Sequence, residues 1–135
     1  MLQNIDNLND SAIVEEFNQK KVWGMETQVN IYGADIELIK DRDCIRQFVI
    51  SLCDVIDMKR FGEPFIERFG SGNLMGYSLC QMIHTSCISA HFAEEDGRIF
   101  LNIFSCKAYK PGVAAKFANQ WFSGKKFEYQ TVLRD

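Results

Sequence analysis

The sequence predicts an α+β fold, a two-layer α/β sandwich in which helices cover one face of a mainly antiparallel sheet. Two patterns indicate this. Runs of alternating apolar residues, typical of strands, follow one another with turn residues between them, and only two longer segments have clear helical periodicity. The chain has 135 residues, of which 47% are hydrophobic, enough for one domain with its own core. We expect an N-terminal arm over residues 1–20 and a single domain over residues 21–135.

The expected order of elements is β-α-β-β-β-β-α-β. The arm is polar and carries at most a short helix at residues 11–19. Residues 21–32 alternate and predict the first strand. A helix then begins after Asp41 or Asp43, because apolar residues recur there at helical spacing. These are Ile45, Phe48, Val49, Leu52, Val55 and Ile56.

Four strands and a second helix are expected in the rest of the chain, before a closing strand. The four strands are predicted over residues 64–69, 74–84, 86–92 and 98–106. Pro111 opens the second helix at its first turn, where a missing N–H costs nothing. The inner face of this helix is assigned to Val113, Phe117, Ala118 and Trp121, and residues 127–133 form the closing strand.

Composition excludes several classes of protein. The net charge is −3 and no basic stripe occurs, which argues against a nucleic-acid partner. No run of eighteen apolar residues occurs, so we expect no membrane span. The first ten residues lack the features of a signal peptide, and the five cysteines lack the spacing of a disulfide framework. These features favour a cytoplasmic protein with free thiols.

Ser78, Ser86, His91 and Cys106 form the most informative set in the chain. Relative to Ser86, the other three lie at −8, +5 and +20. They include a Ser-x-x-Ser-x-His core and a Phe-Ser-Cys ending. Together they offer a hydroxyl nucleophile, a base that titrates near neutrality and a thiol that can exchange a proton near pH 7.

This set resembles the prokaryotic S-adenosylmethionine decarboxylases, which cut their own backbone before a serine and convert that serine into a covalent pyruvoyl group. The resemblance implies cleavage between Thr85 and Ser86, with Ser86 becoming the pyruvoyl cofactor that holds the substrate as a Schiff base. It implies that His91 is the processing base, that Ser78 assists processing, and that Cys106 returns a proton to the substrate.

The resemblance extends over residues 23–106. It implies that Phe69 stacks on the substrate and that Glu95, at +9 from Ser86, lies in the substrate-binding region. This chain also departs from the family pattern. Thr85 stands where glutamate usually precedes the cleaved serine, and Lys107 stands where glycine usually follows the catalytic cysteine.

The function implied by the resemblance is decarboxylation of S-adenosylmethionine, which yields an aminopropyl donor for spermidine synthesis and CO2. It also implies a homodimer that packs sheet to sheet and shares its active sites. The strands at residues 74–83 and 98–104 support this, because they carry apolar residues on both faces.

Other functions stay open at this stage. A pyruvoyl enzyme of the same fold could decarboxylate ornithine or arginine, and an uncleaved relative could bind a ligand without catalysis. Cys80 and His84, with Cys87 and His91 nearby, could hold a metal, but the paired spacing of a zinc site is absent and we expect none. A thiol hydrolase built on Cys106 and His91 would lack an orienting third residue.

Overall fold

A computed structural model describes residues 2–4 and 9–135 of the chain. In this part of the chain, seven strands form one antiparallel sheet in the order β1-β7-β2-β6-β5-β4-β3. The strands are β1 (Leu2–Asn4), β2 (Gly24–Tyr32), β3 (Phe65–Phe69), β4 (Gly76–Ile83), β5 (Ser86–Ala93), β6 (Arg98–Ser105) and β7 (Lys126–Arg134).

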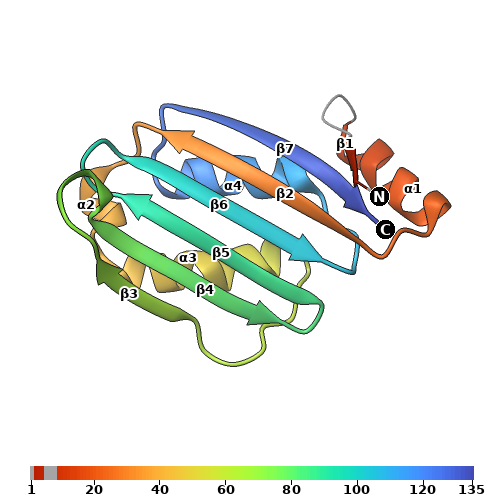
Figure 1. Cartoon of the computed structure of the whole chain (residues 1–135), viewed down its shortest axis with the longest axis horizontal. Coiled ribbons are helices and arrows are strands. Elements are labelled where there is room, and N and C mark those ends of the chain that lie inside the picture. Colours follow the sequence, from red (N-terminus) through yellow and green to blue (C-terminus); the bar gives the residue numbers. More distant parts are fainter. Residues whose placement is uncertain (1, 5–8) are drawn as a thin grey trace.

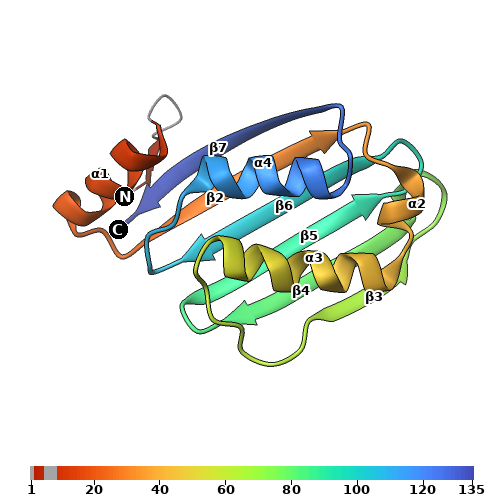
Figure 2. The same ribbon diagram turned by 180° about the vertical axis from the view of Figure 1, so that it is seen from behind.

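Two helices, α3 (Arg42–Val55) and α4 (Pro111–Trp121), lie side by side across one face of the sheet (Figure 2). The opposite face carries no helix (Figure 1). This arrangement confirms the predicted α+β sandwich with helices on one face. None of the helices in the described ranges is long and apolar enough to cross a membrane.

The helix α1 (Asp10–Lys20) belongs to the same core as the rest of the domain. Its Ile13 and Phe17 are buried in the main hydrophobic cluster. The expected helix is therefore present, but it is packed against the domain instead of lying in a separate arm. Met1 and residues 5–8 of the predicted arm lie outside the described residues.

The helix α3 begins where the sequence predicted it. Asp41 is its N-cap, and its carboxylate accepts hydrogen bonds from the backbone N–H groups of Asp43 and Cys44. The predicted apolar stripe faces the sheet, except that Val55 is 42% exposed. Two short elements were not expected, namely β1 and α2 (Ile36–Ile39).

The inner face of α4 agrees with the predicted one at Ala118 and differs elsewhere. Its alanines at 114, 115 and 118 are buried, whereas Val113 is 40% exposed. Phe117 and Trp121 are only half-buried and pack against Phe48 of α3. Small side chains let α4 approach the sheet closely, so the helix is rotated away from the face that the larger residues indicated.

The hairpin between β4 and β5 is the part of the fold that matters most for function. Its turn has two residues, His84 and Thr85, and Ile83 pairs with Ser86 across it. Ser86 also pairs with Ser105, the last residue of β6. The predicted cleavage site thus lies at one end of the sheet, at the tip of a tight hairpin.

The two faces of the sheet differ in character. On β2, β5 and β6, the residues that face the helices are almost all buried. The face without helices, called the open face below, carries polar side chains together with several large exposed apolar ones. Its exposed apolar side chains include Phe65, Phe69, Met82 and Phe100.

Candidate active site

The carbonyl group of Thr85 is held by the chain segment that follows β6. Its oxygen accepts a hydrogen bond of 3.0 Å from the backbone N–H of Cys106. This carbonyl carbon is the one that the Ser86 hydroxyl would attack. A fixed N–H on the oxygen draws electrons from the carbonyl carbon and stabilises the negative charge that an attack creates there.

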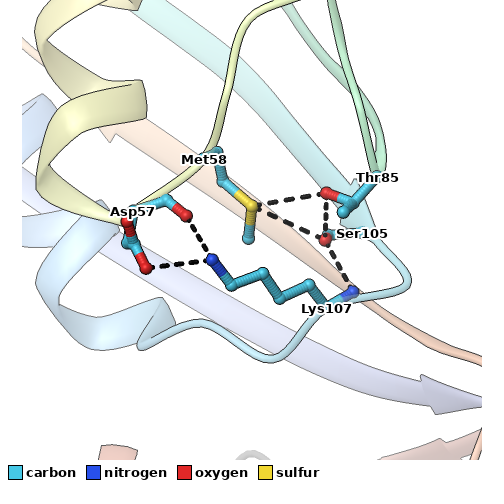
Figure 3. Close-up of polar contacts among 5 residues, drawn as sticks. All are labelled: Asp57, Met58, Thr85, Ser105 and Lys107. Carbon is cyan, nitrogen blue, oxygen red and sulfur yellow. Dashed lines mark hydrogen bonds and ion pairs between the residues drawn. The ribbon is translucent and has the colours of Figure 1, made fainter.

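The side chain of Thr85 is also held in place. Its hydroxyl oxygen accepts a 2.8 Å hydrogen bond from Ser105 Oγ and lies 3.4 Å from Met58 Sδ, to which it can donate (Figure 3). Ser105 Oγ in turn accepts a 2.9 Å bond from the backbone N–H of Lys107. Lys107 Nζ reaches Asp57, the second residue after α3, at its carbonyl oxygen (2.7 Å) and its carboxylate (2.9 Å).

Cys106 lies beside this carbonyl and its side chain is exposed. The pairing of Ser86 with Ser105 brings the thiol residue and the predicted cleavage site to the same end of the sheet. Thr85, Ser86 and Cys106 are therefore brought together, as a shared site requires.

Ser78 and His91 form a second group. They are directly opposite each other on β4 and β5, and Ser78 Oγ lies 2.9 Å from His91 Nδ1. Both are half-buried on the open face. A hydrogen bond between a hydroxyl and an imidazole nitrogen at this distance fixes the orientation of the ring.

Within one chain, His91 does not reach Ser86. The two residues are five positions apart on β5, which corresponds to about 16 Å along an extended strand. Strand alternation also directs their side chains to opposite faces of the sheet. The residues predicted to act together on the backbone thus form two separate groups in a single chain.

Phe69 and Glu95 lie near the opposite end of the sheet from Ser86. Phe69 is 58% exposed at the end of β3, where it pairs with Gly76. Glu95 is exposed in the turn that follows β5. From Ser86 to the end of β5 the strand extends about 23 Å. Neither residue contacts the cleavage site of its own chain.

Glu94, rather than Glu95, makes the main ion pair in this region. Both of its carboxylate oxygens accept hydrogen bonds from Arg68, at 2.6 and 2.8 Å. These bonds hold the pKa of the Glu94 carboxyl below its usual range. The pair ties β3 to the turn after β5, which places Phe69 next to that turn.

The remaining cysteines and histidine of the predicted metal alternative do not converge. Among the described residues, no three histidine, cysteine or acidic side chains form a group that could hold a metal ion. Burial raises the pKa of the Cys87 thiol. His84 lies in the hairpin turn, where its ring contacts Phe61 edge to face.

Comparison with known proteins decides the family. The sequence model described as S-adenosylmethionine decarboxylase matches residues 25–135. The chain belongs to this family. The resemblance inferred from the spacing around Ser86 is thereby confirmed, and it favours S-adenosylmethionine over the amino-acid substrates considered as alternatives.

Two curated relatives agree with this assignment. Both are S-adenosylmethionine decarboxylase proenzymes from strains of Clostridium botulinum, each 24% identical over 115 residues, with 84% of this chain and 96% of the relative covered. The crystal structure of the adenosylmethionine decarboxylase from Aquifex aeolicus matches with a TM-score of 0.72 and 18% identity, covering 84% of this chain and 91% of that one. This structural match shows that the fold is the same.

Several residues around the cleavage site could not be assigned from the sequence. Ser105 was only part of a matching tripeptide, although its fully buried hydroxyl contacts Thr85. Met58 and Asp57 are more than 25 positions away from Thr85 in the sequence. Their only sequence signal is their place just after a predicted helix, which does not reveal a contact with a hairpin tip.

Proposed function

We propose that this protein decarboxylates S-adenosylmethionine with a pyruvoyl group that it makes from its own Ser86. Membership of the S-adenosylmethionine decarboxylase family supports the reaction, and the curated relatives are named as proenzymes. The observation that carries the proposal is the contact between the Thr85 carbonyl oxygen and the Cys106 N–H. It supplies a charge-stabilising donor at the carbonyl that self-cleavage has to activate.

Self-cleavage begins when the Ser86 hydroxyl adds to the Thr85 carbonyl carbon. The Thr85–Ser86 C–N bond breaks, the serine nitrogen becomes a free amine, and an ester replaces the peptide. A base then removes the serine α-hydrogen, and the Thr85 carboxylate leaves from the β-carbon. The resulting dehydroalanine takes up one water and releases ammonia, which leaves the pyruvoyl group at position 86.

The Ser78–His91 pair is suited to the proton transfers of this sequence. An imidazole can accept the hydroxyl proton or the α-hydrogen on a ring nitrogen and give it up again. Ser78 orients the ring through the 2.9 Å contact with Nδ1. That contact leaves Nε2 as the nitrogen available for proton transfer, to a partner chain because Ser86 of the same chain is out of reach.

The pyruvoyl group supplies a carbonyl that binds the substrate amine and accepts the electrons left by the departing CO2. Cys106 then delivers a proton to the substrate α-carbon. Its side chain is exposed, and its backbone N–H binds the Thr85 carbonyl at the same end of the sheet as position 86. Phe69 offers a face for the adenine ring and the sulfonium, and Glu95 offers a negative charge near that cation.

These roles require a homodimer that packs through the open faces of its two sheets. Ser86 and Cys106 are at one end of the sheet, whereas Phe69 and Glu95 are at the other. A two-fold axis that lies between the two sheets and runs perpendicular to their strands would place the Ser86 end of each sheet over the Phe69 end of the partner's sheet. The exposed apolar side chains of the open face favour such an interface.

We also propose that the protein works in the cytoplasm. All five of its cysteines are free thiols, and three of them, Cys80, Cys87 and Cys106, are exposed or half-buried on the sheet or beside the cleavage site. A reducing compartment would keep the Cys106 thiol available for proton transfer.

The substrate is tested by measuring CO2 release from carboxyl-labelled S-adenosylmethionine, ornithine and arginine. We expect release from S-adenosylmethionine alone and none from the Ser86→Ala variant. Release from ornithine or arginine at a rate that matches or exceeds that from S-adenosylmethionine would contradict the proposed substrate. Release by Ser86→Ala at the wild-type rate would contradict the pyruvoyl chemistry itself.

A further inference from the structure

Thr85 and Lys107 both differ from the residues usual in the family, and the structure joins them in one chain of hydrogen bonds (Figure 3). The Lys107 N–H donates to Ser105 Oγ, and the Ser105 hydroxyl donates to Thr85 Oγ1. The Thr85 hydroxyl is then free to donate to the sulfur of Met58. In this order each hydroxyl donates one hydrogen bond and accepts one, so the bonds reinforce one another.

Ser105 is the central member of this chain and has no access to water. It is fully buried, and Met58 is only 6% exposed. Its contact with Met58 Sδ, at 3.7 Å, is longer than its 2.8 Å bond to Thr85. Because a buried hydroxyl that loses its partner is costly, the bond to Thr85 is the favoured arrangement.

The segment that carries Ser105 is itself anchored. Lys107 Nζ binds the Asp57 carbonyl oxygen and carboxylate, which ties residues 105–107 to the end of α3. The Asp57 carboxylate is 95% exposed, so the bond to the backbone carbonyl is the less screened of the two.

Two consecutive residues therefore hold the carbonyl and the hydroxyl of Thr85. Cys106 binds the carbonyl through a backbone N–H, and Ser105 binds the side chain. The side-chain bond fixes the Cα and Cβ atoms of Thr85 next to Ser105, which limits how far the carbonyl can move from the Cys106 N–H.

We propose that Ser105 is a positioning residue for self-cleavage, which acts through Thr85 to keep the scissile carbonyl on the Cys106 N–H. This inference rests on the proposed self-cleavage at Ser86. In the attack, the Ser86 oxygen forms the new bond to the carbonyl carbon, and the electron pair moves to the carbonyl oxygen. Ser105 touches none of the reacting atoms, and its effect is on the orientation of the carbonyl.

The test compares cleavage rates of Ser105→Ala, Thr85→Val and the double variant during cell-free synthesis, from the appearance of the 86–135 fragment. We expect each single variant to be slowed about tenfold. The double variant should be slowed no further, because both substitutions remove the same bond. Thr85→Ser keeps the hydroxyl and should cleave at close to the wild-type rate.

Thr131→Val is the matched control. It removes another buried hydroxyl, one that lies 3.1 Å from Thr27 Oγ1 and away from the cleavage site. We expect it to lower thermal stability without slowing cleavage. If Ser105→Ala fails to fold, Thr85→Val and Thr85→Ser carry the comparison, because Thr85 is only half-buried at a hairpin tip.

A second measurement separates positioning from general damage. The cleavage rate of Thr85→Val should fall by the same factor at every pH, because the groups that transfer protons are unchanged and only the orientation of the carbonyl differs. A pH profile of cleavage that changes in Thr85→Val, or wild-type cleavage rates in both Ser105→Ala and Thr85→Val, would overturn the role of Ser105 while leaving self-cleavage intact. A wild-type chain that never cuts itself would remove both this inference and the proposed function.

Discussion

The surroundings of the Thr85–Ser86 peptide follow from the register of three strands. Ser86 pairs with Ile83 on one side and with Ser105 on the other, so the first residue after β6 has to lie beside the Thr85 carbonyl. A shift of β6 by one residue would put a neighbouring residue in place of Cys106 beside this carbonyl and move the thiol to the other face. The chemistry at this point therefore depends on register as much as on residue type.

Replacing Cys106 separates the two stages of the proposed reaction. In Cys106→Ala the backbone N–H is retained, so the chain should still cut itself. Turnover should fall by at least about a hundredfold, because the acid that returns the proton is missing. Protonation at the wrong carbon would convert the pyruvoyl group to alanine.

Mass spectrometry of the 86–135 fragment during turnover, alongside steady-state rates, checks this. The matched control is Cys80→Ala, an exposed thiol on the open face that has no assigned role. Wild-type turnover of Cys106→Ala without inactivation would mean that the thiol is structural.

At the scale of elements, α1 and α4 stabilise each other through a single carboxylate. The N-cap position of α4 is Lys110, whose side chain makes no capping bond. Instead Asp10, the first residue of α1, accepts bonds from the N–H groups of Gly112 (2.8 Å) and Val113 (3.0 Å). A negative charge at this end of a helix also interacts favourably with its dipole.

Asp10→Ala should therefore destabilise the protein by about 1 kcal/mol, which corresponds to a fall in Tm of about 4 °C. Differential scanning calorimetry measures this directly. Glu15→Ala is the control, because Glu15 is an acidic residue of the same helix whose carboxylate accepts a hydrogen bond from Gln19 of that helix. If the Tm of Asp10→Ala is no lower than the Tm of Glu15→Ala, Asp10 does not stabilise the N-terminus of α4.

The Arg68–Glu94 pair makes stability depend on pH. Since Arg68 lowers the pKa of Glu94 in the folded state, the pair contributes fully above the pKa of the unfolded glutamate, about 4.3. That contribution to stability is lost as the pH falls through the lowered pKa that Glu94 has in the folded state. Arg68→Gln should thus be less stable than wild type by up to about 1 kcal/mol at pH 7, and the gap should narrow below pH ~4.

Urea unfolding of both proteins at pH 7 and at pH 3 provides the comparison. Arg98→Gln is the control, because Arg98 pairs with the exposed Asp96 in the adjacent turn. A gap between wild type and Arg68→Gln that is unchanged from pH 7 to pH 3 would contradict the assigned role of the pair.

The strands and the two main helices could be predicted from the sequence because their apolar periodicity is strong. The helix at Asp41 had both a capping residue and a stripe, and it lies where expected. The elements β1 and α2 were missed since three or four residues carry no periodic signal. Val113 was assigned to the core because of its size, whereas close packing of α4 depends on its alanines.

The site could be predicted only in its residue types and their spacing. The separation of His91 from Ser86 depends on which residues flank the turn, and His84-Thr85 is not one of the usual two-residue hairpin sequences. The choice between Glu94 and Glu95 as partner of Arg68 likewise depends on the geometry of a turn.

At the scale of the whole molecule, two features lead us to expect a dimer. They are the open face of the sheet and the separation of the site residues into two groups. The sheet has helices on one side only (Figures 1 and 2). The residues for one reaction lie in two separate groups. A symmetric pair of chains covers the apolar side chains of both sheets and brings the partner's histidine to the end of the sheet that carries the Thr85–Ser86 peptide. The protein should therefore be a dimer in light scattering at the concentrations where it cleaves itself.

Mixed dimers test the sharing of sites. His91→Ala keeps Ser86 but lacks the base, and Ser86→Ala keeps the base but lacks the nucleophile. Each variant alone should remain uncut. When the two are coexpressed, the His91→Ala chain should be cleaved, because the partner's His91 supplies the base that this chain lacks. Coexpression that yields no cleavage, together with a monomeric wild-type protein, would contradict the shared site.

The most direct test of the central claim is the mass of the denatured wild-type protein. We predict two fragments, 1–85 and 86–135, the second beginning with a pyruvoyl group in place of Ser86 and reactive toward carbonyl reagents such as phenylhydrazine. Ser86→Ala should give one chain of full length. A single uncut chain in wild-type protein that decarboxylates S-adenosylmethionine at full rate would contradict the account.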